Sequence, residues 1–314
     1  MPKKGFFGTN FMKTDKDMEK RQAKLIDLNE WERFGGGGNG WSYINRNDSS
    51  IILKLNKEEI PEEISYREYL ISSALYEVGI SCPRVFDFVT DGARFGMTVE
   101  RIRGKKSYVR MIADNPELLE PLAKEFALRS REFHSIRCDT TKFESRKERC
   151  RRLFASCPEL PDNVKEMLYV CLDSMEDVPY PVHGDFTPGN IIRADGNDYW
   201  IDLGDFTYGD PDMDMASLVF LARYTPAKVV EYLFHLTKKQ IGQFLEIYGR
   251  EYYGDRWGSR ELNQKIDSVI KIKAGLSISN NPRSALLYIP LLRGQKLKFA
   301  IMMRIADVLV RKFN

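Results

Sequence analysis

Two short polar runs on either side of a hairpin signal constrain the fold of this 314-residue chain most strongly. The first is His183-Gly-Asp-Phe-Thr-Pro-Gly-Asn190 and the second is Ile201-Asp-Leu-Gly-Asp205. Between them, short β-type runs at 190–193 and 199–202 flank Ala-Asp-Gly-Asn, which predicts a β-hairpin because Asp-Gly favours a tight turn. In a hairpin the end of the second strand lies beside the start of the first, so we expect Asp202 to lie beside Asp185 and Asn190.

These three residues are the types that phosphorylation of a hydroxyl requires. One carboxylate must orient the attacking hydroxyl and accept its proton, while an amide oxygen and a second carboxylate hold magnesium on the nucleotide phosphates. We therefore assign Asp185 as the catalytic base and Asn190 and Asp202 as metal ligands. The joint signal is strong, because the first run by itself is already rare by chance.

The rest of the chain is typical of two lobes. Strands at 51–55, 84–89 and 94–102 surround a helix at 62–78, and from residue 117 onward apolar residues recur at helical spacing. We predict an α+β fold with a small antiparallel-sheet lobe over residues 1–103 and a mainly α-helical lobe over 104–314. The crevice between the lobes is the expected site.

A glycine-rich run precedes the strand at 51–55. Its glycines are assigned to a turn over the nucleotide phosphates, and they are Gly35, Gly36, Gly37, Gly38 and Gly40. A dinucleotide-binding fold would place a helix directly after such glycines, whereas here a strand follows. A flexible hairpin turn without a ligand is the alternative interpretation.

Lys54 lies in the middle of that strand, between two leucines. A charged group there calls for a partner, and Glu68 supplies one from an otherwise apolar stripe of the helix at 62–78. A Lys54–Glu68 pair would place an ammonium group at the phosphates; the alternative is an edge-strand lysine and a partly solvated glutamate. Glu100 and Ile102, at the end of the strand 94–102, complete the predicted nucleotide-binding set.

Charge is nearly balanced over the whole chain, with 48 basic and 45 acidic residues. This balance does not favour nucleic acid as a partner, and no apolar run is long enough for a membrane span. We expect a cytoplasmic protein without an obligate protein partner. From residue 181 to 216, however, acidic side chains greatly outnumber basic ones, which fits either magnesium or a cationic substrate. The basic run from Arg146 to Arg152 is interpreted as a solvated helix face, because acidic residues interleave with it.

The motifs and their spacing resemble the aminoglycoside phosphotransferase and choline kinase-like family. The resemblance extends from about Trp31 to Phe220 and includes Gly209-Asp-Pro-Asp-Met-Asp-Met-Ala216. It implies a protein kinase-like fold of two lobes, ATP or GTP and magnesium as cofactors, and transfer of the γ-phosphoryl group to a small-molecule hydroxyl. It further implies that Asp214 braces the loop that carries Asp185, and that His134 is structural.

The acceptor class is left open by the sequence. An aminoglycoside, choline or ethanolamine, or a sugar would each suit. A peptide is disfavoured because few residues separate Gly204 from Asp212, which leaves little chain for a peptide-docking activation segment. The alternatives are a non-catalytic nucleotide-binding pseudokinase module and, less favoured, a protein kinase.

Overall fold

The computed structural model of the protein describes residues 22–36 and 40–312. The described residues cluster into two compact units: those up to 69 together with 85–100 form the first, and those of 70–84 together with those from 101 onward form the second. Helix α1 (Glu62–Glu77) contributes to both units. The lobe boundary suggested after residue 103 stays a prediction.

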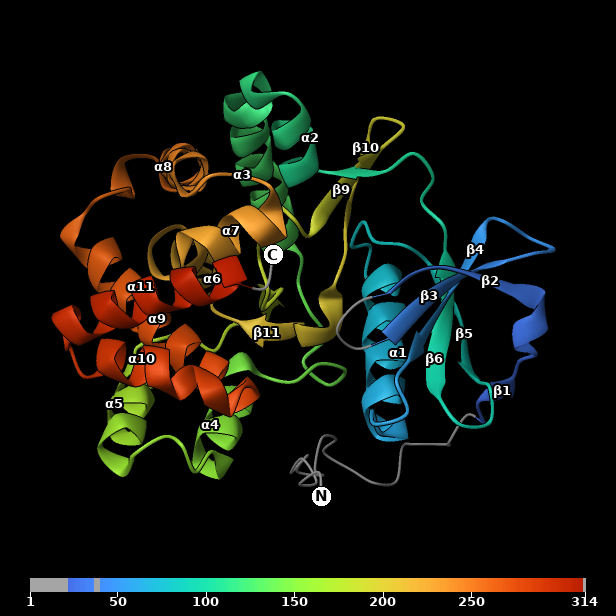
Figure 1. The fold of residues 1–314 in the computed structure, drawn as a ribbon, viewed down its shortest axis with the longest axis horizontal. Coiled ribbons are helices and arrows are strands. Elements are labelled where there is room, and N and C mark those ends of the chain that lie inside the picture. The colour runs from blue at the N-terminus through green and yellow to red at the C-terminus, as the bar shows by residue number, and fades with distance from the viewer. Residues whose placement is uncertain (1–21, 37–39, 313–314) are drawn as a thin grey trace. The chain divides into compact units, whose positions relative to one another are not determined.

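The first unit is built on a six-stranded sheet, coloured blue to cyan in Figure 1. Its strand order is β1-β5-β6-β4-β3-β2, and every neighbouring pair is antiparallel except β1 with β5. The antiparallel prediction thus holds for five strands, and the two-residue strand β1 adds one parallel pair at the edge. The strands are β1 (Lys24–Leu25), β2 (Trp31–Gly36), β3 (Gly40–Asn45), β4 (Ile51–Asn56), β5 (Val85–Thr90) and β6 (Phe95–Glu100).

The glycine-rich run joins β2 to β3. The prediction that the strand at 51–55 directly follows the glycines is wrong, because Trp41, Tyr43 and Ile44 already form β3. Aromatic and β-branched side chains favour this extended conformation. The strands on either side of the glycine-rich run are therefore β2 and β3, which pair with each other, and β4 is the third strand, paired with β3 along its length.

The second unit is mainly helical and carries two small antiparallel sheets. One sheet has the order β10-β9-β7 and the other pairs β11 with β8. The strands are β7 (Lys106–Ser107), β8 (Tyr180–Val182), β9 (Ile191–Ala194), β10 (Asn197–Trp200) and β11 (Thr207–Gly209). The predicted hairpin is confirmed as β9 and β10.

Ten helices belong to the described part of this unit in addition to the end of α1. They are α2 (Tyr108–Asp114), α3 (Leu119–Ser135), α4 (Arg146–Ser156), α5 (Asp162–Asp173), α6 (Asp212–Val219), α7 (Ala227–Phe234), α8 (Lys238–Tyr253), α9 (Arg260–Asn280), α10 (Ala285–Leu292) and α11 (Lys296–Lys312). Among the described helices, none is both long enough and apolar enough to pass through a membrane.

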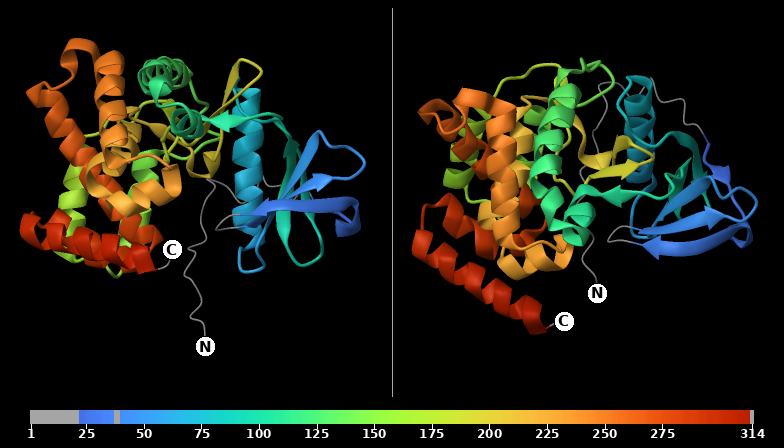
Figure 2. Two further views of the ribbon diagram at one scale, coloured as in Figure 1. Left: turned by 45° about the horizontal axis from the view of Figure 1, so that its top comes forward. Right: turned by 90° about the horizontal axis from the view of Figure 1, so that it is seen from above.

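An aromatic core lies between α3 and α8, which run alongside each other in the right-hand view of Figure 2. Phe126 of α3 is fully buried, and its ring centroid lies 5.6 Å from that of Phe244 and 5.4 Å from that of Tyr248, both on α8. Phe186 and Trp200 join this core from the loop after β8 and from β10. The core therefore anchors both motifs that the sequence singled out.

Candidate active site

The loop of residues 183–190 connects β8 to β9 and is anchored by its own aromatic residue. Phe186 is fully buried, with its ring stacked on Trp200 at a centroid distance of 5.2 Å. Burying a phenylalanine side chain contributes roughly 1.5–3 kcal/mol. Because Phe186 points into the core, the adjacent Asp185 side chain is left half exposed, at 49%.

Asp214 braces the start of this loop, as the family resemblance implied. Its fully buried carboxylate accepts hydrogen bonds from the backbone N–H of His183 at 2.7 Å and of Gly184 at 2.8 Å. A carboxylate can only accept, so His134 donates to it from Nε2 at 3.2 Å. Burial by itself would raise the pKa of Asp214, but the hydrogen bond and charge of His134 outweigh it and hold the pKa below its usual range.

His134 and His183 both act within the structure of the loop. His134 is buried, and its second ring nitrogen lies 2.8 Å from the Tyr252 hydroxyl. The His183 ring donates from Nε2 to the Ile201 carbonyl at 3.1 Å and accepts at Nδ1 from the backbone N–H of Asp185 at 3.4 Å. The structural interpretation of His134 is therefore confirmed, and His183 links the two motifs.

Gly184 is required by its backbone conformation and its surroundings. Its φ angle is +87°, and a Cβ atom built there would lie 2.7 Å from the carbonyl oxygen of Asp205 and 3.1 Å from the guanidinium of Arg146. A larger residue is excluded on both counts. The glycine at this position thus lets the second motif and α4 approach the loop closely.

Asn190 is oriented by Asp185. Its amide nitrogen donates to the Asp185 carbonyl oxygen at 2.7 Å and to the Asp185 carboxylate at 3.1 Å. Within the described residues its Oδ1 accepts no hydrogen bond, which leaves that oxygen available to a cation. The structure thus brings the predicted base and the first predicted metal ligand into direct contact.

The β9–β10 hairpin brings the chain back to Asn190 one residue before Asp202. The N–H of its neighbour Ile201 donates to the carbonyl oxygen of Asn190 at 3.0 Å. Asp202 itself is exposed. Its backbone has the left-handed conformation, with φ 60° and ψ 49°, which Asp tolerates better than most residues. An amide oxygen and an exposed carboxylate suit Mg²⁺, which keeps several waters and binds few protein ligands. Among the described residues, no group of three or more His, Cys, Asp or Glu side chains is placed to hold a metal.

Most of the acidic run is neutralised by the protein itself. Lys265 of α9 contacts Asp210 at 2.8 Å and Asp212 at 2.6 Å. Asp198 pairs with Arg193 at 2.8 Å and accepts from the Tyr108 hydroxyl at 2.8 Å. Burial and the Asp198 carboxylate together raise the pKa of Tyr108 far above its usual range. The local acidic excess is therefore no evidence for a cationic substrate.

Three basic side chains that sequence reasoning did not assign lie against the loop. The interpretation of the basic run 146–152 as a solvated face is wrong for Arg146, which is 5% exposed, and for Arg149, whose side chain is 12% exposed. Their positions share a helix face with the buried Cys150 and Phe154, a spacing of three and four residues that marks the inner face. Lys273 of α9 donates to the Gly184 carbonyl at 3.1 Å and lies 3.8 Å from the Asp185 carboxylate. No comparable signal in the sequence identifies Lys273.

The predicted nucleotide-binding residues lie mostly in the first unit. Gly37 and Gly38 fall outside the described residues. The other glycines of the run are Gly35 and Gly36 at the end of β2 and Gly40 at the start of β3. A Cβ atom at Gly40 would lie 2.4 Å from the Leu55 carbonyl oxygen, so glycine is needed there for strand packing. Glu100 ends β6, and Ile102 packs with Ile192 and Ala194 of β9 in the second unit.

Lys54 lies on the face of the sheet that α1 contacts. Lys54 of β4 lies opposite Met97 of β6, and Met97 lies opposite Phe88 of β5. Because directly opposite residues share a face of the sheet, Lys54 and Phe88 lie on the same face. Phe88 contacts Tyr69 of α1 at a centroid distance of 5.7 Å. Lys54 is exposed and Glu68 is half-buried. Their pairing stays a prediction.

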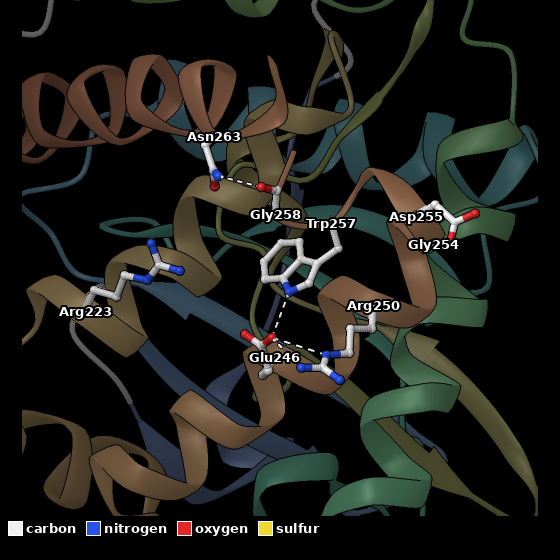
Figure 3. A pocket seen from close by; sticks show the side chains of 8 residues that line it. All are labelled: Arg223, Glu246, Arg250, Gly254, Asp255, Trp257, Gly258 and Asn263. Carbon is white, nitrogen blue, oxygen red and sulfur yellow. Dashed lines mark hydrogen bonds and ion pairs between the residues drawn. The ribbon is translucent and has the colours of Figure 1, made fainter. Parts of the chain in front are cut away.

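A larger pocket of about 540 Å³ lies elsewhere in the second unit, between the end of α8 and the start of α9. Figure 3 shows its polar groups directed at one another: the Trp257 indole donates to Glu246 at 3.0 Å, and Asn263 donates to the Gly258 carbonyl at 3.1 Å. None of the residues predicted for catalysis, nucleotide or metal lines it. It is therefore not the candidate active site.

Several solved structures share this fold. An ADP-bound aminoglycoside phosphotransferase APH(2'')-Ib matches with 20% identity and a TM-score of 0.57, covering 87% of this chain and 95% of that one. A thermostable mutant of aminoglycoside phosphotransferase APH(4)-Ia matches with 13% identity and a TM-score of 0.56, covering 90% of this chain and 94% of that one. The streptomycin-ATP-APH(2")-IIa ternary complex matches with 18% identity and a TM-score of 0.55, covering 84% and 91%. The predicted kinase-like fold is confirmed.

Sequence comparison gives the family directly. No curated protein sequence matches the chain. A sequence profile described as the phosphotransferase enzyme family (APH) matches residues 31–258, which is well over half of the chain. The predicted resemblance and enzyme class are confirmed, and this protein belongs to the phosphotransferase enzyme family.

Proposed function

We propose that this protein transfers the γ-phosphoryl group of a nucleoside triphosphate, ATP or GTP, to a hydroxyl of a small molecule. The observation that carries the proposal is the contact between Asp185 and Asn190 on a loop braced by Asp214, with Ile201, the residue before Asp202, hydrogen-bonded to Asn190. A half-exposed carboxylate next to a free amide oxygen suits a base beside a magnesium ligand.

Asp185 would act on the acceptor. Its carboxylate accepts a hydrogen bond from the acceptor hydroxyl, aims that oxygen at the γ-phosphorus and takes its proton as the new P–O bond forms. The bond from the γ-phosphorus to the bridging oxygen breaks, and the nucleoside diphosphate leaves. Asn190 and Asp202 would hold magnesium, which neutralises phosphate charge when bound. The loop is fixed before substrate arrives, so little reorganisation is needed.

The first unit would bind the nucleotide. Lys54 would contact the phosphates and Glu68 would orient it, the glycines of the run 35–40 would lie over the phosphates, and Glu100 and Ile102 would contact the rest of the nucleotide. Support comes from the position of Lys54 on the sheet face that α1 contacts. The structural neighbours solved with ADP or ATP support a nucleotide as the donor.

A small molecule is favoured as acceptor over a peptide. Only α6 and a short strand, β11, follow the second motif closely, which leaves no long segment there to dock a peptide. Neighbours solved in complex with hygromycin B or streptomycin support a small acceptor as a class, without identifying it here. We include no nucleic acid and no obligate protein partner in this proposal.

The test is a transfer assay with matched variants. Purified protein is incubated with magnesium and γ-labelled ATP or GTP and a panel of aminoglycosides, choline, ethanolamine, sugars and hydroxy acids. We expect label on at least one small molecule, and Asp185→Asn to lower kcat by about 100-fold or more while magnesium-ATP still raises the Tm. Asp195→Asn makes the same charge change at the exposed β9–β10 turn and should remain active.

The outcomes separate the rival functions. Unchanged turnover in Asp185→Asn would remove the base assignment. A magnesium-ATP effect on Tm without label on any acceptor would favour the pseudokinase module, and label on a peptide would favour a protein kinase. Lys54→Ala and Asp202→Ala should each weaken the nucleotide effect on Tm, because both residues are assigned to the phosphates and metal.

A further inference from the structure

A small basic pocket opens beside the catalytic loop within the second unit. Its volume is about 40 Å³, roughly three times what one water molecule needs. The walls come from α4 and α9, and the floor comes from the loop at Gly184 and the turn at Asp205. The pocket is too small for a whole sugar and large enough for a carboxylate or phosphate group.

The charges on this pocket are predominantly positive. Arg146, Arg149 and Lys273 line it, against a single carboxylate, that of Asp205. Arg149 pairs with the Asp205 carboxylate, and Arg146 donates to the Asp205 backbone carbonyl at 3.5 Å. Even with the Asp185 carboxylate, which lies 3.8 Å from Lys273, two acidic groups do not balance three basic ones, so an anion would be attracted here.

Two buried guanidinium nitrogens at this pocket lack an acceptor. Within the described residues, Nε of Arg146 and one terminal nitrogen of Arg149 are inaccessible to solvent and have no hydrogen-bond partner. Arg146 is 5% exposed. An N–H group buried without a partner destabilises a fold, so such groups are normally satisfied. Guanidinium groups bind carboxylates and phosphates in a planar, paired geometry, so these two arginines, with hydrogen-bonding capacity left over, suit an anion in the pocket.

Lys273 links the pocket to the reacting groups. Its ammonium lies 3.1 Å from the Gly184 carbonyl oxygen and 3.8 Å from the Asp185 carboxylate. An anion oxygen and an acceptor hydroxyl, each at hydrogen-bond distance of about 3 Å from Lys273 and Asp185, would be no more than about 10 Å apart. That span is reached within one small molecule.

We infer that Arg146, Arg149 and Lys273 form a subsite for an anionic group of the acceptor itself, so that the substrate is a small hydroxylated carboxylate or phosphate ester. This inference rests on the proposed function, because it places the acceptor hydroxyl at Asp185. It also revises the charge expected of the acceptor, since the acidic side chains that suggested a cation are paired within the protein.

The first experiment measures anion binding without turnover. Inorganic phosphate or acetate is titrated at constant ionic strength, with chloride as the balance, and the Tm is recorded. We expect phosphate, acetate or both to raise the Tm of the native protein and of Arg151→Gln, an exposed arginine on the opposite face of α4. Arg149→Gln and Lys273→Gln should each lose at least half of that rise. An equal response in all four proteins would overturn the subsite.

The second experiment compares matched acceptors. Glycerol, glycerate and glycerol phosphate form one series, and glucose, gluconate and glucose 6-phosphate form another. We expect the anionic members to have at least tenfold higher kcat/KM than the neutral one, and Lys273→Gln to raise KM for them more than it lowers kcat. Preference for carboxylate or for phosphate identifies the anionic group.

The two experiments separate the subsite from the proposed function. If a neutral or cationic acceptor is phosphorylated best, the phosphotransferase function stands and the subsite inference is overturned. If no acceptor is phosphorylated while anion binding depends on Arg149, the subsite stands as an anion site and the proposed transfer reaction is overturned.

Discussion

Replacing Asp214 by asparagine tests the brace that holds the loop of residues 183–190. The carboxylate accepts three hydrogen bonds, from the backbone of His183 and Gly184 and from His134. In Asp214→Asn the amide oxygen can face the two donors on one side, and its NH₂ group then faces the N–H of Gly184. One charge-assisted hydrogen bond is lost, which costs about 1.5–3 kcal/mol. The other two remain as bonds to a neutral oxygen, and each is weakened by about 1 kcal/mol.

The expected loss is thus about 3–5 kcal/mol of unfolding free energy at pH 7. At roughly 2 °C per kcal/mol or more for a unit of this size, the Tm should fall by at least about 6 °C. Urea unfolding followed by circular dichroism at 222 nm reports on the helical second unit. Asp195→Asn, an exposed turn residue with the same charge change, should shift stability by less than about 0.5 kcal/mol.

The pH dependence of this difference has a definite sign. The pKa of Asp214 is lowered in the folded protein, so the unfolded chain takes up its proton first as the pH falls. The stabilisation is complete above the unfolded pKa of about 3.9 and is lost as the pH falls through the folded value. The gap between native protein and Asp214→Asn should therefore be constant from pH 7 to pH 5 and shrink below about pH 4. A loss under 1 kcal/mol at pH 7, or a gap that widens in acid, would refute the brace.

Two further substitutions test other parts of the site. Gly184→Ala should lower stability by about 2 kcal/mol or more, because φ is +87° and the new Cβ would meet the Asp205 carbonyl at 2.7 Å; an unchanged urea midpoint would show that the loop adapts. Lys265→Met should cost about 3 kcal/mol by leaving Asp210 and Asp212 without their cation. Burial would lower the pKa of Lys265, but its hydrogen bonds to these carboxylates outweigh burial and raise the pKa. The difference in unfolding free energy between the native protein and Lys265→Met should therefore persist below about pH 10 and shrink as the pH rises further. Thermal unfolding between pH 7 and pH 11 checks this, and a gap that is already closed at pH 9 would contradict it.

Local signals in the chain were sufficient for the elements that surround the site. The helix predicted at 62–78 is α1, the strands at 84–89 and 94–102 are β5 and β6, and the turn signal at 194–197 joins β9 to β10. Hairpins and amphipathic helices depend on residues close in sequence, so their patterns are legible without knowledge of the fold. For the same reason the return of the chain to Asn190 just before Asp202 could be predicted.

The sequence by itself determined the family and predicted the loop and the residues that would carry transfer chemistry, because these lie in short motifs with fixed spacing. Tertiary structure decided the charge of the surroundings. Whether the carboxylates of residues 198–214 face a ligand or a protein cation depends on Arg193 and on Lys265, which lies more than fifty residues away. Arg149 and Lys273 meet at one pocket only because α4 and α9 pack together. Electrostatic contacts depend on distance in space, and a one-dimensional pattern does not contain those distances.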